Sequence, residues 1–158
     1  MTLASSKLCA EPDSKARLRL WLRLLRLTRG IENNLREKLR LEHATTLPRF
    51  DVMSALSRHA DGLKMSELSG VLRVSNGNVT GIIDRLVEEG HVVRVPVKGD
   101  RRASAVKLTP QGLSEFATQA AAHEAWIDKA LAGLDAQDAQ HMADQLSALM
   151  TEGERHGA

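Results

Sequence analysis

The sequence of 158 residues has few aromatic side chains, and this scarcity limits how its core can be built. Tyrosine is absent, and the Trp and Phe residues are Trp21, Phe50, Phe116 and Trp126. Because 42% of the residues are hydrophobic and 27% are charged, the composition is that of an ordinary globular domain. The core must then consist mainly of Leu, Val, Ile, Ala and Met, which suits the packing of helices.

Cysteine and long apolar runs are equally scarce. Cys9 is the sole cysteine, so no internal disulfide can form, which fits a reducing cytoplasm. No apolar run approaches the roughly 20 residues that a membrane-spanning helix needs. The N-terminal residues lack a long apolar segment before a small-residue cleavage site, so we expect no signal peptide. The sequence predicts a cytoplasmic protein without a membrane partner.

Arrangements of catalytic and metal-binding residues are missing as well. The sequence shows no Ser-His-Asp arrangement, Gly-rich phosphate loop or carboxylate dyad of the kind that enzymes use. Its six histidines are scattered, and none pairs with a carboxylate or cysteine at metal-ligand spacing on one helix face. The sequence therefore predicts neither an enzyme nor a bound metal or cofactor.

The stretch Lys64–Gly112 predicts a helix, a tight turn, a second helix and a two-stranded hairpin. Ser66 is expected to cap the first helix, and residues 73–75 form the turn. The second helix, which ends at Gly90, is predicted from apolar residues at helical spacing: Val79, Ile82, Ile83, Leu86 and Val87. This order is that of a winged helix-turn-helix, a fold used mainly to hold one helix in a DNA groove.

Two segments that favour strands follow that helix and predict the hairpin. Residues 91–95 are rich in β-branched side chains, and residues 104–108 alternate between apolar and polar. The hairpin tip is expected over 96–102, with Gly99 and Asp100 at the turn. Thr109 and Pro110 then predict a new helix with a capping side chain and a proline at its first position.

Long helices are expected on both sides of this module. The first runs from a cap at Asp13 or Ser14 to about Leu41. It carries two apolar stripes, namely Leu20, Leu24, Leu27, Ile31, Leu35 and Leu39, and then Leu18, Leu22 and Leu25. One domain core does not need that much apolar surface, so we expect this helix and the C-terminal helices to pair with those of a second copy.

The predicted fold class is mainly α with a small β-hairpin wing. It is a winged helix-turn-helix whose N- and C-terminal helices form a dimerisation domain. The expected divisions are a flexible arm over 1–13, a helical dimerisation region over 14–47 and 110–155, and a DNA-binding domain over 48–109.

The net charge of +2 is unevenly distributed along the chain. Residues 1–41 contain ten Lys and Arg against four Asp and Glu, and residues 73–107 contain seven against four. Residues 110–158 contain two basic and eight acidic residues. The basic regions are either solvated helix faces or surfaces that face a polyanion, whereas the acidic C-terminal region should face away from one.

The outward face of the helix predicted after residue 75 carries side chains that suit DNA contacts. An α-helix fits the major groove of DNA, where Asn can bond adenine through two groups and Thr can touch a thymine methyl. The predicted contacts on this face are Ser75, Asn76, Asn78, Thr80 and Arg85. Gly77 and Gly81 each cost the helix roughly 1 kcal/mol relative to Ala. Either they allow a close approach to DNA, or they relieve packing against a neighbouring helix.

The hairpin tip is the second candidate for DNA contact. An arginine at such a tip can enter the minor groove, where negative potential is focused. The predicted contacts here are Lys98, Asp100, Arg101 and Arg102. Asp100 is expected to hold the Arg102 guanidinium in place by a charge-assisted bond.

The tip and the residues after it match a known signature. With the helix order on both sides, the chain resembles the MarR family of bacterial transcription regulators over about residues 15–152. The signature D-x-R-x-x-x-V-x-L-T-x-x-G is matched without a gap by Asp100, Arg102, Val106, Leu108, Thr109 and Gly112. The resemblance implies a homodimer that binds double-stranded DNA at a pseudo-palindromic operator, with a small ligand relieving the binding, as in a repressor.

A narrower resemblance concerns the ligand. Residues 45–51 and 77–82 are similar to the branch of the family that controls the catabolism of hydroxycinnamates and related aromatic acids. Members of that branch respond to aryl-CoA thioesters or free aromatic acids. The chain departs from the commoner family pattern because Gly81 stands where an Arg often contacts DNA. The main contacts to the bases are therefore expected from Asn76, Asn78 and Arg85.

The second stripe of the first helix changes from leucine to polar and cationic residues after Leu25, beginning at Arg29 and Asn33. Either the helix emerges into solvent there, or these residues line a cavity for an anionic or phenolic ligand. The family places its ligand pocket between the dimerisation helices and the winged module. The predicted effector-binding residues are Arg29, Asn33, Arg36, His43, Arg49 and Phe50.

Two alternatives to a ligand-responsive DNA-binding regulator remain open. One is a winged-helix module that binds protein, which predicts an apolar or acidic outward face rather than Asn78, Thr80 and a basic tip. The other is a redox-responsive regulator that uses Cys9, although redox-sensing relatives use tyrosines to lower the pKa of their cysteine and this chain has none.

Overall fold

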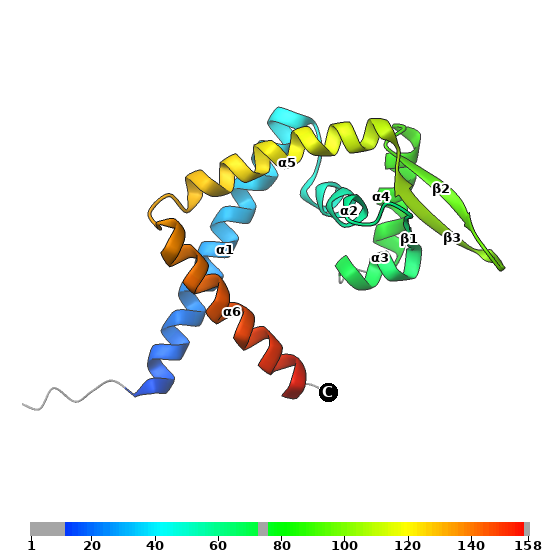
Figure 1. Cartoon of the computed structure of the whole chain (residues 1–158). Helices are drawn as coiled ribbons and strands as arrows, with labels where there is room; N and C mark the ends of the chain where they lie inside the picture. Colours follow the sequence, from blue (N-terminus) through cyan, green and yellow to red (C-terminus); the bar gives the residue numbers. More distant parts are fainter. Residues whose placement is uncertain (1–11, 73–75, 157–158) are drawn as a thin grey trace, which may run out of the picture. The chain divides into compact units, whose positions relative to one another are not determined.

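The computed structural model describes residues 12–72 and 76–156, and the structural statements below concern these residues (Figure 1). The chain divides into two compact units, residues 1–47 and 48–158. The structure is mostly helical with one small antiparallel sheet, which confirms the predicted fold class. Its elements are α1 (Asp13–His43), α2 (Leu47–Ser57), β1 (Leu63–Lys64), α3 (Met65–Leu72), α4 (Asn76–Glu88), β2 (Val92–Val97), β3 (Asp100–Leu108), α5 (Pro110–Ala130) and α6 (Ala136–His156).

The first unit is dominated by α1, a helix of 31 residues. Neither Asp13 nor Ser14 caps it as predicted, because Pro12 occupies the capping position and makes no side-chain cap bond. The helix ends at His43 and is followed by the cap residue Ala44, a left-handed residue (φ 49°) whose N–H donates to the Leu39 carbonyl. Leu35 and Leu39 are buried, but the N-terminal half of α1 leaves large apolar side chains about half exposed: Leu18, Leu20, Trp21, Leu22 and Leu27.

The second unit is built around one hydrophobic core. Its buried residues come from α2, α3, α4 and the sheet, and they are Val52, Met53, Ala55, Leu56, Leu63, Leu68, Val79, Ile83, Leu86, Val92, Val106 and Leu108. The predicted core residues Ile82, Val87 and Phe116 pack against this cluster and are partly buried. Because Val79, Ile83 and Leu86 are fully buried, the apolar period of α4 determines which side of the helix faces the core.

The sheet has three antiparallel strands in the order β1-β3-β2. The short strand β1, which the sequence did not predict, pairs Leu63 with Val106 and Lys64 with Ala105. The connection before β1 turns at Gly62 (φ 91°), where a Cβ would lie 2.7 Å from the Val106 carbonyl oxygen. Glycine is needed there for both reasons, since other residues resist a positive φ and the strand leaves no room.

Two local predictions in this unit are wrong by one residue. Ser66 does not cap α3, because the helix already begins at Met65. The start of the helix is stabilised instead by Glu67, whose carboxylate accepts the Lys64 N–H at 2.7 Å. The hairpin turn is formed by Lys98 and Gly99 (φ 83°) rather than Gly99 and Asp100, because Asp100 pairs with Val97 as the first residue of β3.

The two C-terminal helices begin with side-chain caps. The Thr109 hydroxyl accepts the Gly112 N–H at 3.0 Å and Pro110 is the first residue of α5, as predicted. Asp135 caps α6 by accepting the Asp138 N–H at 2.8 Å. No helix in the described part of the chain combines the length and apolar character that crossing a membrane requires.

Candidate nucleic-acid interface

The helix α4 presents a polar face on the side opposite its core residues. Asn78, Thr80, Asp84 and Arg85 are all exposed, as the apolar spacing predicted. Ser75 lies outside the described residues, and Asn76 is the first residue of α4. Amide, hydroxyl and guanidinium groups therefore lie along one exposed side of a short helix. The amide and the hydroxyl can donate and accept hydrogen bonds, whereas the guanidinium only donates them.

Gly81 lies in the middle of this exposed face. A Cβ built on Gly81 would meet no atom within 4 Å, so an alanine would fit without a clash. The packing explanation for this glycine is therefore wrong. Gly81 still costs the helix about 1 kcal/mol relative to Ala, and it leaves the surface of α4 open for something outside the chain to approach the backbone.

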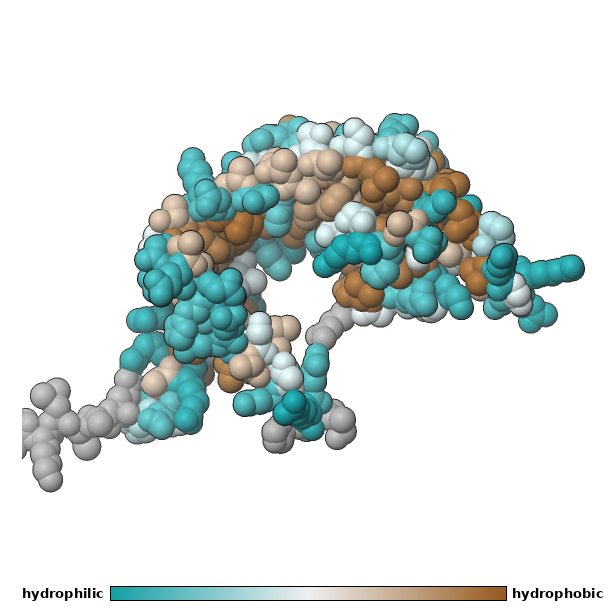
Figure 2. Space-filling model, viewed as in Figure 1, coloured by the Kyte–Doolittle hydropathy of each residue, from teal (hydrophilic) through white to brown (hydrophobic). Residues whose placement is uncertain are grey.

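The hairpin of β2 and β3 carries exposed cations at its far end. Lys98, Arg101 and Arg102 are exposed, and Figure 2 shows the end of the hairpin as a hydrophilic projection. Asp100 accepts the backbone N–H of Arg102 at 2.9 Å rather than the Arg102 guanidinium, which corrects the predicted contact. The carboxylate therefore stiffens the turn and leaves the direction of the Arg102 side chain to other contacts.

Two ion pairs connect α4 and the residue after it to the neighbouring elements β2 and α2. Arg94 on β2 donates to Asp84 on α4 at 2.5 Å, and Glu89, just after α4, pairs with Arg49 on α2. The Nδ1 atom of His91 lies 3.5 Å from the same Glu89 carboxylate. The sequence signal for the first pair was an outward acid on a helix followed ten residues later by an outward base on a strand.

The predicted effector residues on α1 lie along one exposed side of that helix. Arg29 and Asn33 are exposed, and Arg36 donates to Asn33 and to Glu32, at 3.4 Å in each case. Arg40 continues the row, but it is bonded to Glu37 at 2.7 Å. That hydrogen bond, helped by the opposite charges, holds the pKa of the Glu37 carboxyl below its usual value and raises the pKa of Arg40.

The remaining effector candidates are already in contact with other residues of the chain. His43 is half-buried at the end of α1. Arg49 is engaged by Glu89, so an effector carboxylate would have to compete with that ion pair. Phe50 is buried, and its ring stacks on His123 with centroids 4.7 Å apart and lies 5.5 Å from the ring of Phe116.

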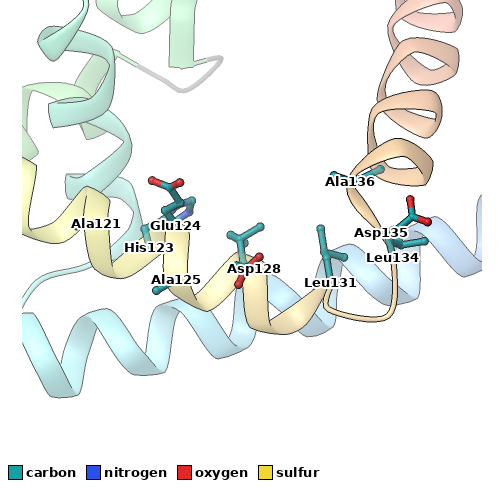
Figure 3. Close-up of a pocket in the computed structure, with 11 residues that line it drawn as sticks. Ala121, His123, Glu124, Ala125, Asp128, Leu131, Leu134, Asp135 and Ala136 are labelled. Atoms are coloured by element: carbon teal, nitrogen blue, oxygen red, sulfur yellow. The ribbon is translucent and has the colours of Figure 1, made fainter.

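A groove of about 780 Å³ lies between the end of α5 and the start of α6 (Figure 3). Its apolar lining includes Ile127, Leu131 and Leu134, and three of its lining residues, Glu124, Asp128 and Asp135, carry carboxylates. None of the predicted effector residues lines this groove. Because its charged groups are acidic, it favours a cationic or basic occupant over an aromatic carboxylate.

Comparison with known proteins identifies the family. A structure of a MarR family transcriptional regulator from Silicibacter pomeroyi is 35% identical, covers 90% of this chain and 99% of that one, and superimposes with a TM-score of 0.73. The model of the MarR family also matches residues 45–103. The chain belongs to the MarR family of transcriptional regulators. The relatives are regulators and not enzymes, which confirms the prediction from the sequence that this chain is not an enzyme.

Two further relatives add detail to the MarR assignment. The transcriptional activatory protein BadR of Rhodopseudomonas palustris is 36% identical over 104 residues, or 63% of this chain. The alignment covers 59% of BadR, so the chain spans less than two thirds of that relative. A MarR mutant from E. coli complexed with operator DNA shares the fold at 24% identity, with 88% and 99% of the two chains covered and a TM-score of 0.71.

Proposed function

We propose that this MarR-family chain is a ligand-responsive regulator that binds double-stranded DNA through α4 and the hairpin wing. The observation that carries the proposal is the exposed face of α4, where Asn78, Thr80 and Arg85 surround Gly81. Such a face suits the major groove, and the basic wing end suits the flanking minor groove. The E. coli structure with operator DNA supports the proposal as an example of the same fold on DNA.

The regulator is proposed to act as a homodimer. The chain leaves large apolar side chains partly exposed on α6, namely Met142, Leu146, Leu149 and Met150, in addition to those on α1. The N-terminal half of α1 is rich in arginine, and the groove beside α6 is acidic, so the two surfaces are complementary between copies. Residues 14–47 and 110–155 then form the dimerisation region, and residues 48–109 form the DNA-binding domain.

A homodimer reads DNA with matched half-sites. Two α4 helices related by a two-fold axis require a pseudo-palindromic operator with half-sites about one helical turn, roughly 34 Å, apart. The direction of regulation depends on where that operator lies. We propose repression relieved by the ligand, although the relative BadR is named as an activatory protein. A reporter is fused to the bound promoter, and its expression is measured with and without the gene that encodes this regulator. Higher expression without the gene indicates repression, and lower expression indicates activation.

The effector is proposed to be an aromatic acid or its CoA thioester. Arg29 and Asn33 lie one turn apart on an exposed side of α1 and could bind a carboxylate or phenol through charge-assisted hydrogen bonds. A ligand releases DNA only if it binds better to a dimer whose α4 helices do not fit the half-sites. A thermal-shift screen of aromatic acids and aryl-CoA thioesters, followed by DNA release with each hit, tests the class.

A salt titration separates the proposed function from a protein-binding winged helix. Duplexes are first selected from a random pool by the wild-type protein, and affinity is then measured between about 50 and 200 mM salt. A protein that makes several phosphate contacts loses roughly a hundredfold or more in affinity across that range. Failure to select any duplex would contradict the proposed function and favour the protein-binding alternative.

A further inference from the structure

An ion pair joins α4 to the first strand of the wing. The Nη2 atom of Arg94 lies 2.5 Å from the Oδ1 atom of Asp84. Arg94 stands on β2 opposite Val106 of β3, so its backbone is fixed by the sheet. The two side chains are 37% and 58% exposed, which places the pair at the surface between the two elements proposed to contact DNA.

The core alone leaves the setting of α4 incompletely defined. Val79, Ile83 and Leu86 bury one side of the helix, but hydrophobic contacts are not directional and tolerate small rotations of a helix about its axis. A charge-assisted hydrogen bond is directional and short. The Asp84–Arg94 pair therefore restricts a rotation that the buried contacts permit.

Apart from its pairing with Arg94, the carboxylate of Asp84 is unfavourable for DNA binding at this position. It lies one helical turn from Thr80 and Gly81, on the face proposed to meet DNA. An exposed acid there repels phosphates, and a partly exposed ion pair adds little to folding stability. Neither general electrostatics nor stability accounts for an acid at this position, whereas a positioning role does.

We propose that Asp84 and Arg94 are positioning residues that set the orientation of α4 relative to the wing. With the pair in place, Asn78 reaches the major groove while the arginines of the wing end reach the flanking minor groove of the same duplex. Neither Asp84 nor Arg94 is required to touch a base. The proposal rests on the proposed DNA-binding function and assigns a specificity role within it.

The substitution Asp84→Asn gives opposite results under the two explanations. If Asp84 is only a surface charge, its removal strengthens binding to every duplex, because a repulsive group is lost. If it positions α4, Asp84→Asn weakens binding to the selected duplex on the order of fivefold, the scale of one exposed ion pair. The ratio of the affinity for the selected duplex to the affinity for a shuffled duplex should then fall. Arg94→Ala should weaken binding to the selected duplex in the same way.

A matched control is available on the same helix. Glu88 is 69% exposed, and within the described residues its ion pair is to Arg85 on the same helix, at 3.9 Å. Glu88→Gln removes the same charge without breaking a link to the wing, so it should leave the preference for the selected duplex unchanged. The charge-swapped double variant Asp84→Arg with Arg94→Asp restores the pair and should recover part of the lost preference.

The outcomes separate this inference from the proposed function. If the wild-type protein selects no duplex, the proposed function fails. If the wild type selects a duplex and Asp84→Asn binds all duplexes more tightly, DNA binding stands and the positioning role is overturned. Melting temperatures measured for every variant exclude unfolding as the cause, and failure of the double variant to recover any preference would show that Arg94 acts by contacting DNA itself.

Discussion

Gly112 lies so close to His91 that a Cβ on Gly112 would be 2.0 Å from the His91 carbonyl oxygen. The same carbonyl accepts the Thr109 N–H at 3.0 Å, and the Thr109 hydroxyl donates to the Gly90 carbonyl at 2.6 Å. The start of α5 is therefore fixed against the connection between α4 and β2, and the contact leaves no space for a side chain.

The first prediction concerns this contact. Gly112→Ala should lower the free energy of unfolding by about 3 kcal/mol, because the clash is with backbone and cannot be relieved by a rotamer change. Urea denaturation followed by circular dichroism measures the loss. Gly133→Ala is the control, since a Cβ there meets no atom within 4 Å. Equal stabilities for the two variants would contradict the close contact.

A second prediction separates folding from DNA binding at Gly81. Gly81→Ala should raise the free energy of unfolding by up to about 1 kcal/mol, because alanine favours the helix and the site is open. The same variant should bind its selected duplex more weakly, because the added methyl group stands where DNA approaches. Gly70→Ala on α3 supplies a similar gain in helix propensity away from α4, and its DNA affinity should be unchanged.

A third prediction assigns different roles to Asn78 and Arg102. Arg102→Ala should weaken binding to all duplexes and reduce the slope of the salt dependence by about one charge. Asn78→Ala should instead change the sequence preference, at a cost of roughly 1–3 kcal/mol for the preferred base. Binding arrays with every single-base change in the selected site measure both. Identical effects of the two variants on all sequences would refute the division.

A fourth prediction tests the dimer. Leu149→Glu places a charge on the apolar side of α6, where the leucine is 58% exposed in the single chain. The variant should sediment as a monomer at concentrations where the wild type is dimeric, because an unpaired charge would be buried at the interface. Gln140→Glu adds the same charge to the opposite side of α6 and should leave the dimer intact.

A fifth prediction addresses the effector. Arg29→Ala and Asn33→Ala should each weaken the ability of an aromatic acid to release DNA, on the order of tenfold, while leaving DNA affinity without ligand unchanged. The measurement is the ligand concentration that releases half of the bound duplex. The pocket assignment is wrong if both variants respond to the ligand as the wild type does.

Much of the fold could be predicted because its signals are local. The apolar period of α4, the β-branched residues before Pro96 and the Thr109-Pro110 pair each specify one element within a few residues. Strand β1 was missed because two residues carry no measurable alternation, and its pairing with Val106 is a contact across more than forty positions. The cap expected at Ser66 failed because Glu67 supplies the bond from within the helix.

The site was predicted in part for the same reason. The exposed positions of α4 follow from its buried ones, so Asn78, Thr80 and Arg85 could be assigned without a structure. The partners of Asp84 and Arg49 could not, because an ion pair between two elements depends on how those elements pack. The stacking of Phe50 on His123 could not be predicted either, because the two residues are far apart in the sequence.

Strand β1 has a consequence for how the wing moves. It pairs with β3 at Ala105 and Val106, so the base of the wing is three strands wide, whereas the part from Pro96 to Ser104 is a two-stranded ribbon. Two-stranded ribbons are only marginally stable alone. Amide hydrogens near Val106 should exchange slowly with solvent, and those near Arg101 quickly. The wing can thus follow variations in groove width while its base keeps α4 in place.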